Sequence, residues 1–371
     1  MDCISSEYVT YGEQMTYQPA VGRVRQSSKT GRRISSLRYL LICGLVVLHL
    51  PPYVALDALP VSLSVFEFVP AFFTHGFFRA TVPVLTCISG YLLFSSAAHY
   101  QYIKIVKTKA KTILLPLILW NLPFVVGLFF LRANNIWTPD VGMYKLYPFS
   151  AEEWLGAVLG IWDSPINYPL NFLRDLFALF LLSPVFLFLI RNAPLLGLVL
   201  VSLVFLFNFD GIIILRSAMA INFYVGGMIA FKRWNLNALD RYWVGLFVLA
   251  LLMYAAAVYF RIENKVVLSL VAPFLIWPMS GWMVKTKMGQ FFIHNSYHSF
   301  FIFLSHAFVL KAAYILYLRA PISIPYAAFW LLTPICTIAV CHLAHHLLRM
   351  FAPRLLNLLT GSRSKRGLTV Q

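Results

Sequence analysis

Charged side chains are scarce in this chain of 371 residues: Asp, Glu, Lys and Arg make up 12% of it, against 60% hydrophobic residues. Soluble globular domains carry about 25% charged residues and do not need so much apolar surface. The composition therefore excludes a soluble globular protein. It predicts instead a protein that crosses a membrane several times.

Acidic residues are rarer still, 13 against 30 lysines and arginines, and the formal net charge is +17. A large positive charge can indicate nucleic-acid binding, but here the basic residues lie between apolar segments and form no continuous patch. This is the distribution that the positive-inside rule predicts for cytoplasmic loops. We therefore expect the lipid bilayer as a partner and no nucleic acid.

Cysteine is also rare: the chain has five, with no CxxC or zinc-ligand spacing. Two groups of histidines have spacings near those of metal ligands: His294 with His298, and His342 with His345 and His346. Neither group has an acidic residue beside it, and the second lies at a basic end of a span, where headgroup contact is the better interpretation. We expect neither a disulfide framework nor a metal site.

Ten apolar runs are long enough to cross a bilayer. They cover approximately residues 38–56, 76–97, 112–131, 169–190, 195–214, 217–231, 243–260, 266–284, 292–316 and 325–348. With the N-terminus inside, most lysines and arginines fall in cytoplasmic segments, and the acidic residues gather in the outside loops. The main outside loop, about 132–168, is best placed to meet a substrate outside the cytoplasm.

The fold class that follows is an all-α, polytopic membrane protein with about ten transmembrane helices and both termini in the cytoplasm. Residues 1–36 are polar, end in a basic run and lack a cleavage site after the next apolar stretch, so we expect a disordered basic tail. The membrane domain covers 37–350, and a second basic tail covers 351–371. The halves show no internal repeat, which disfavours an inverted-repeat transporter.

Two ionisable residues share one face of the first apolar helix, RYLLICGLVVLH. Eleven residues at about 100° each make three turns plus about 20°, so Arg38 and His49 point the same way, roughly 16 Å apart. Polar residues at membrane depth are costly and are usually retained for ligand, proton or ion chemistry. We therefore expect the active site along this face.

The second span holds further polar residues. His75 and Arg79 are four positions apart and share a face near its outer end. Ser89 and Gly90 follow farther along. The glycine allows close helix approach, and the serine can form a hydrogen bond to a neighbouring helix.

The fourth span places Arg174 next to Asp175. Neighbours on a helix point about 100° apart, so we expect each to pair with another helix, with Arg79 one candidate partner for Asp175. A structural ion pair that sets the helix register is an equal alternative.

In the ninth span, His306 lies in an apolar setting that requires a partner.

Four segments together make the chain resemble the acyltransferase-3 family of integral membrane acyltransferases, which modify polysaccharides, glycans and lipids. RYLLICGLVVLH matches the family's Arg/Lys-x10-His signature, and FFRATVPVLTCISGYLLF matches an arginine followed by apolar residues and SGY or SGF. NFLRDLFALFLLSP is similar to a Trp-Phe-Leu-Arg-Asp-Leu pattern, with Asn171 in place of tryptophan. FFIHNSYHSFFIFLSHAFVL is similar to a late Tyr-Leu-x-His segment.

The resemblance implies transfer of a short acyl group from cytoplasmic acyl-CoA to a hydroxyl of a surface polysaccharide, an exopolysaccharide or its lipid-linked precursor. It also implies the bacterial inner membrane, no bound cofactor, and a polysaccharide biosynthesis complex as a further partner. The chain looks most like the succinoglycan-type members, which favours succinyl over acetyl by a small margin. An acidic acyl group would need a cation such as Arg79, Arg174 or Arg216. A glycan transporter and a non-catalytic subunit are the alternatives.

The residue types support roles in this reaction. A neutral imidazole is the natural general base near pH 7, a role that we assign to His49. Arg79 or the Ser89 hydroxyl would stabilise the oxyanion that develops on the attacked thioester. Arg38, toward the cytoplasmic end of the same face, would bind phosphates of coenzyme A. Supporting roles fall to Arg174, Asp175 and His306.

Overall fold

The computed structural model describes residues 29–60, 64–96, 101–136, 144–207, 209, 213–215, 218–263, 266–321 and 323–362. All regular elements in these residues are helices, which confirms the all-α prediction for this part of the chain. In order they are α1 (Lys29–Leu48), α2 (Val65–Ala71), η1 (Phe72–Gly76), η2 (Phe77–Ala80), α3 (Thr81–Phe94), α4 (Tyr102–Lys109), η4 (Ala110–Leu114), α5 (Leu115–Ala133), α6 (Ala151–Leu159), η5 (Tyr168–Leu170), α7 (Asn171–Leu181), α8 (Ser183–Asn192), α9 (Pro194–Leu206), α10 (Ala218–Phe231), η6 (Asp240–Tyr242), α11 (Trp243–Tyr259), α12 (Val266–Met283), α13 (Lys287–Asn295), η7 (Ser296–His298), α14 (Ser299–Leu318), α15 (Tyr326–Phe351) and α16 (Pro353–Leu359).

Six helical stretches in the described residues are long and apolar enough to cross a membrane, and a seventh results if the helices on either side of a 56° bend count as one span. This bend separates α7 from α8 and lies just before Pro184, which cannot donate a helical hydrogen bond. Two shorter helices, α9 and α10, are also apolar. The chain is therefore a multi-pass membrane protein. The count of ten spans and the side of each terminus stay predictions.

The ends of the helical body differ from the predicted tail boundaries. α1 begins at Lys29, inside the segment 1–36 that the sequence assigned to the first tail. Likewise α15 and α16 continue past residue 350, to Leu359. The rest of both predicted tails, 1–28 and 363–371, lies outside the described residues.

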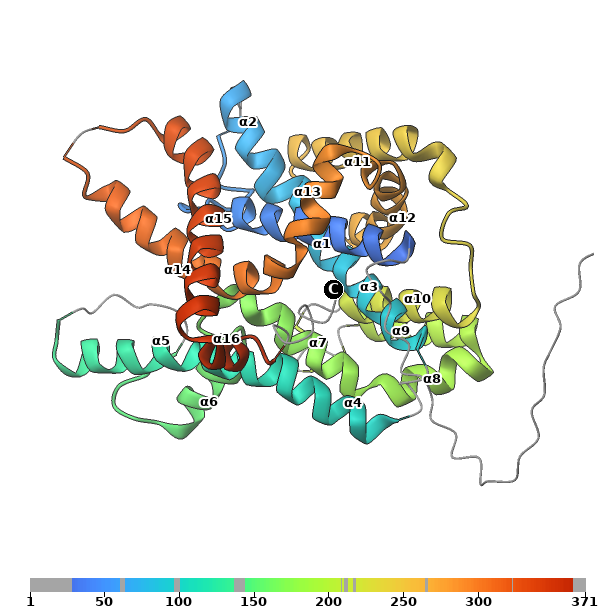
Figure 1. Cartoon of the computed structure of the whole chain (residues 1–371), viewed down its shortest axis with the longest axis horizontal. Helices are drawn as coiled ribbons and strands as arrows, with labels where there is room; N and C mark the ends of the chain where they lie inside the picture. Colours follow the sequence, from blue (N-terminus) through green and yellow to red (C-terminus); the bar gives the residue numbers. More distant parts are fainter. Residues whose placement is uncertain are drawn as a thin grey trace, which may run out of the picture.

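The first helix, α1, lies in the interior of the molecule. It packs against α3, α12, α13, α14 and α15. In Figure 1 it runs across the upper middle of the view, with α12 near its N-terminal end and α15 near its C-terminal end. Among its residues only Lys29 and Arg38 have exposed side chains. A helix enclosed on most sides can carry polar residues only where they find partners or an open cavity.

A buried arginine fixes the N-terminal end of α1. Arg33 is 1% exposed, and all five of its N–H groups donate hydrogen bonds. Two of these go to the carboxylate oxygens of Asp240, at 2.8 and 2.9 Å, and the guanidinium lies over the Trp277 ring. The remaining acceptors are Ser280 Oγ, Asn237 Oδ1 and the Trp277 carbonyl oxygen. This network ties α1 to α12 and to the segment that precedes α11.

The tightest helix crossing joins α3 and α10 through two glycines. A Cβ on Gly90 would overlap the Phe223 carbonyl, and a Cβ on Gly226 would overlap the Cys87 carbonyl. Backbones can approach this closely only where side chains are absent. The prediction that the glycine of the SGY motif serves helix packing is therefore confirmed.

A small cluster packs α6 and its flanking segments against α5. Tyr144, Leu146 and Val158 are buried in it, and the Tyr144 hydroxyl donates to the Ser164 carbonyl at 3.1 Å. Burial, with the negative charges of Asp163 and Glu153, raises the pKa of Tyr144 to about 12. The segment before α7 is therefore held firmly beside the cavity described next.

Candidate active site

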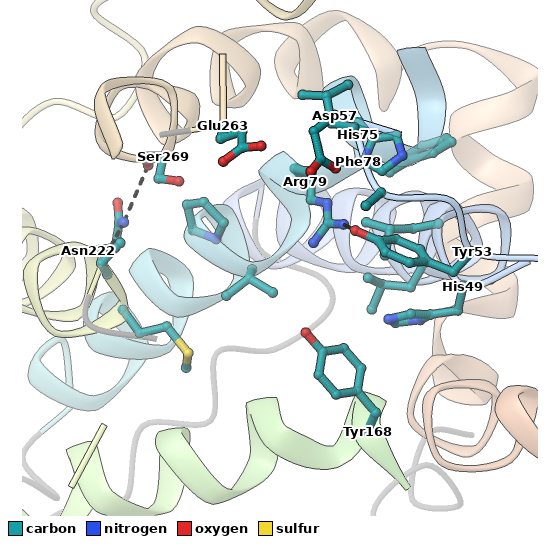
Figure 2. Close-up of a pocket in the computed structure, with 18 residues that line it drawn as sticks. His49, Tyr53, Asp57, His75, Phe78, Arg79, Tyr168, Asn222, Glu263 and Ser269 are labelled. Carbon is teal, nitrogen blue, oxygen red and sulfur yellow. Dashed lines mark hydrogen bonds between the residues drawn. The ribbon is translucent and has the colours of Figure 1, made fainter. Parts of the chain in front are cut away.

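A cavity of about 470 Å³ opens beside the C-terminal end of α1. Its walls come from the end of α1, the segment that follows it, the η1–η2–α3 stretch, and the beginnings of α10 and α12. His49 and Tyr168 lie on one side of this space, whereas Asn222, Ser269 and Glu263 lie on the other (Figure 2). Arg79 and His75 also line it.

A pair of histidines joins the cavity wall to the protein interior: His49 lines the cavity, and His306 lies behind it. His49 Nδ1 lies 3.1 Å from His306 Nε2, and the two rings are stacked with centroids 5.3 Å apart. His306 is fully buried, and its Nδ1 lies 2.9 Å from the Phe303 carbonyl and 3.1 Å from that of Ile302. The partner that the sequence required for His306 is thus His49, together with the helix backbone.

These contacts determine which nitrogens carry protons. Carbonyl oxygens only accept, so His306 Nδ1 is the protonated nitrogen. Burying a charge away from water is costly, which favours the neutral ring and leaves the lone pair on His306 Nε2. His49 Nδ1–H then donates to it, and His49 Nε2 carries the lone pair. A base whose tautomer is set by a second residue is oriented for proton abstraction.

The position of His49 at the C-terminal end of a helix adds an electrostatic effect. It follows the last residue of α1, and its backbone N–H still bonds to the Leu45 carbonyl at 3.0 Å. The C-terminal end of a helix carries a partial negative charge that favours a cation. An imidazolium at His49 would therefore be stabilised by the end of the helix.

Arg79 reaches the cavity because its helix is distorted. The stretch before α3 is π-helical at η1 and 3₁₀-helical at η2, and Pro83 cannot donate to the preceding turn. Arg79 Nε donates to the Thr74 carbonyl and Nη2 donates to the Tyr53 hydroxyl, both at 3.1 Å. The guanidinium is half-buried and faces the open space in Figure 2.

Several residues of the cavity were not singled out by the sequence. Tyr53, Asp57 and Glu263 belong to loops that carry no motif. Asn222 lies on α10, with its side-chain amide donating to the Ala218 carbonyl at 2.9 Å. Tyr168 directly precedes the NFLRDL segment, a position that could have drawn attention to it. The loops approach His49 only through folding.

Two predicted site residues lie elsewhere. Ser89 is not among the cavity-lining residues, and its hydroxyl donates to the Leu85 carbonyl of its own helix at 2.7 Å. Arg38 does not line the cavity either. Its side chain is exposed although its neighbours Leu37 and Tyr39 are buried, so α1 borders accessible space at this point.

The prediction that Arg174 and Asp175 pair with other helices is wrong. Arg174 Nη1 lies 2.8 Å from Asp175 Oδ1, so the two neighbours pair with each other. The long arginine side chain bends back far enough to overcome the angle between the two positions. Arg79 does not contact Asp175 in the described residues, because its guanidinium is engaged at Thr74 and Tyr53.

This ion pair also holds neighbouring backbone segments in place through hydrogen bonds. Arg174 also donates to three carbonyl oxygens, those of Gly160, Ile161 and Ile213. Asp175 is fully buried and accepts from the Leu215 backbone N–H at 3.3 Å. The pair thus joins α7 to the segments before it and before α10. Arg216 lies outside the described residues.

One member of the first histidine group, His298, lies beside two members of the second. The His298 ring centroid lies 4.0 Å from that of His342 and 4.5 Å from that of His345. His342 Nε2 lies 2.9 Å from the Tyr39 hydroxyl. No group of three or more His, Cys, Asp or Glu side chains in the described part of the chain has a geometry that could hold a metal ion.

Comparison with known proteins identifies the class to which this site belongs. The acyltransferase domain family matches residues 32–346, and the chain therefore belongs to this family of acyltransferases. The chain is 29% identical, over 347 residues, to the succinoglycan biosynthesis protein ExoH of Rhizobium meliloti (strain 1021). That alignment covers 90% of this chain and 92% of the relative. No solved structure matches.

Proposed function

We propose that this enzyme transfers a succinyl group from cytoplasmic succinyl-CoA to a sugar hydroxyl of an exopolysaccharide or its lipid-linked precursor, in the bacterial inner membrane. The observation that carries the proposal is His49, which is held by the buried His306 and lines a cavity that Arg79 also lines. Similarity to a succinoglycan biosynthesis protein supports the glycan acceptor.

In the proposed reaction, His49 Nε2 accepts the proton of the sugar hydroxyl as its oxygen attacks the thioester carbonyl carbon. The new C–O bond forms, the C–S bond breaks, and the departing thiolate takes the proton back from His49. The products are the sugar ester and free coenzyme A. His306 keeps the His49 ring in the required tautomer throughout, because its own Nδ1–H remains bonded to backbone carbonyls.

Arg38 would hold the phosphates of coenzyme A. It is an exposed arginine on an otherwise enclosed helix, and a guanidinium binds phosphate through paired hydrogen bonds. The roughly 16 Å along α1 between Arg38 and His49 suits an extended donor whose thioester lies near the base.

Arg79 would bind the free carboxylate of the succinyl group. Its Nε and Nη2 are engaged, and the structure gives its Nη1 no hydrogen-bond partner among the described residues. Arg174, the other described arginine that the sequence considered for this role, is occupied by backbone carbonyls and Asp175. An acetyl group would leave the pocket's guanidinium without an anion.

The experiment that tests the function is NMR of ester-linked acyl groups on the host's surface and secreted polysaccharides. It compares wild type, a deletion, His49→Ala, and the exposed control His346→Ala. We expect one ester signal to disappear in the deletion and in His49→Ala while the sugar backbone persists, and to remain in His346→Ala. Loss of the polymer itself in the deletion would instead favour a transporter.

The acyl group is tested with purified enzyme and two donors. Arg79→Gln should lower transfer from succinyl-CoA about thirtyfold while leaving transfer from acetyl-CoA nearly unchanged, because only succinate carries the second carboxylate. Arg319→Gln, an exposed arginine outside the cavity, serves as the control. Equal losses with both donors would assign Arg79 to the oxyanion instead.

A further inference from the structure

Two tyrosines in the cavity wall are strongly exposed: Tyr53 at 61% and Tyr168 at 48%. Their surroundings differ. The Tyr53 hydroxyl accepts a hydrogen bond from Arg79, so this ring belongs to the end of the cavity where the proposed acyl carboxylate would bind. The Tyr168 ring stands edge-on to His49, with centroids 6.2 Å apart and planes at 82°.

The backbone on both sides of Tyr168 is anchored by buried contacts. The backbone N–H of the preceding Asn167 donates to the buried side chain of Asn121 at 2.9 Å. Leu170, two residues after Tyr168, is fully buried. Arg174 donates hydrogen bonds to the carbonyl oxygens of Gly160 and Ile161. The segment is therefore well anchored on both sides of an aromatic ring that stays half open to the cavity. Apolar packing does not explain that exposure.

We propose that Tyr168 is the binding platform for the acceptor sugar, a role that rests on the proposed function. The face of a pyranose ring presents C–H groups, which pack on an aromatic face, while its hydroxyls point outward around the rim. A pyranose on the Tyr168 ring is adjacent to His49, and one of its rim hydroxyls can approach Nε2. In Figure 2 the Tyr168 side chain reaches from η5 into the open space below Arg79.

This assignment divides the cavity between the two substrates. Tyr53 and Arg79 receive the acyl group, Tyr168 receives the sugar, and the oriented base lies between them. The acceptor is identified only as a pyranose with an accessible apolar face. Tyr168 is thus a positioning residue that acts on KM for the glycan.

The test uses the full chain in lipid nanodiscs with succinyl-CoA as donor. The acceptor is a set of oligosaccharides from host exopolysaccharide whose esters have been removed by mild alkali. Tyr168→Ala should raise KM for the oligosaccharide about tenfold, with KM for succinyl-CoA unchanged. Tyr168→Phe and Tyr168→Trp, which keep an aromatic face, should stay within about twofold of wild type.

The matched control is Tyr259→Ala, which removes a tyrosine that is 71% exposed and does not line the cavity. It should leave both KM values unchanged, as expected for a ring in the interfacial aromatic belt. An unchanged glycan KM in Tyr168→Ala, or a Tyr168→Phe enzyme as poor as the alanine variant, would overturn the platform alone. A wild-type enzyme that esterifies neither these oligosaccharides nor their lipid-linked forms would overturn the proposed function as well.

Discussion

The two ends of α1 carry polar sites of opposite character. At the N-terminal end, Arg33 is 1% exposed and every one of its N–H groups has an acceptor. At the C-terminal end, His49 and Arg79 are only partly buried and border a cavity of about 470 Å³. Both ends place cationic groups inside an apolar protein, but only the second leaves them room for a ligand.

The difference shows how a structural role of a buried charge can be told from a ligand-binding role. An arginine whose donors are all satisfied by the protein holds helices together, because no group remains to bind anything else. An arginine held by two bonds beside a cavity still has donors to offer. Satisfaction of hydrogen bonds, more than burial or charge, separates the structural site from the chemical one. Three variants test that separation, and a fourth tests a helix crossing beside the cavity.

The largest effect is expected for His49→Ala. Removal of the proposed general base should lower kcat about a thousandfold, and the unfolding temperature in detergent should stay near that of wild type. Steady-state transfer assays and a thermal melt measure the two quantities. Unaltered transfer would show that proton abstraction does not depend on this ring.

Arg33→Met should have the opposite effect to His49→Ala: it should lower stability and leave kcat near normal. It leaves the partly buried Asp240 carboxylate without its cationic partner and removes five hydrogen bonds, which should lower the free energy of unfolding by about 3 kcal/mol. We expect a clearly lower thermal midpoint, with kcat of the remaining folded enzyme near normal. Double replacement with Asp240→Asn should recover part of the loss. A stable but inactive Arg33→Met enzyme would contradict the structural role.

His306→Phe should have an intermediate effect. The ring shape is kept, but His49 Nδ1–H loses its acceptor, so the base is no longer held in one tautomer. A loss of about thirtyfold in kcat is expected, which is the size typical when a hydrogen-bond partner that orients a functional histidine is removed. The pH dependence of kcat should shift as well, which a loss of packing alone would not produce. His346→Ala is the control.

The smallest effect is expected for Gly226→Ala, which tests the crossing of α3 and α10, two helices that line the cavity. The new methyl group would overlap the Cys87 carbonyl, and the helices should separate at a cost of about 1.5 kcal/mol. Gly127→Ala has nothing within 4 Å of its new Cβ and should leave the thermal midpoint unchanged. Equal behaviour of the two variants would mean that the crossing is not tight in solution.

Much of the helical framework could be predicted from apolar runs, since each run must satisfy its backbone within itself inside a membrane. The prediction of an active site along the face shared by Arg38 and His49 stays a prediction: His49 lines the cavity, whereas Arg38 does not. The neighbours Arg174 and Asp175 were misjudged, because helix geometry describes where Cβ atoms point and not how far a long arginine side chain can fold back. The extension of α1 back to Lys29 was also missed, because a polar sequence hid a helix stabilised by tertiary contacts.

By itself, the sequence determined the class of protein, the membrane as its solvent and the acyltransferase motifs, because hydropathy and motif spacing are local properties of the chain. Only the tertiary structure decided that His306 orients His49, that Arg33 is structural, and that Tyr53, Tyr168 and Glu263 border the same cavity. These residues come from segments far apart in the chain. Their proximity depends on how whole helices pack, which no short stretch of sequence encodes.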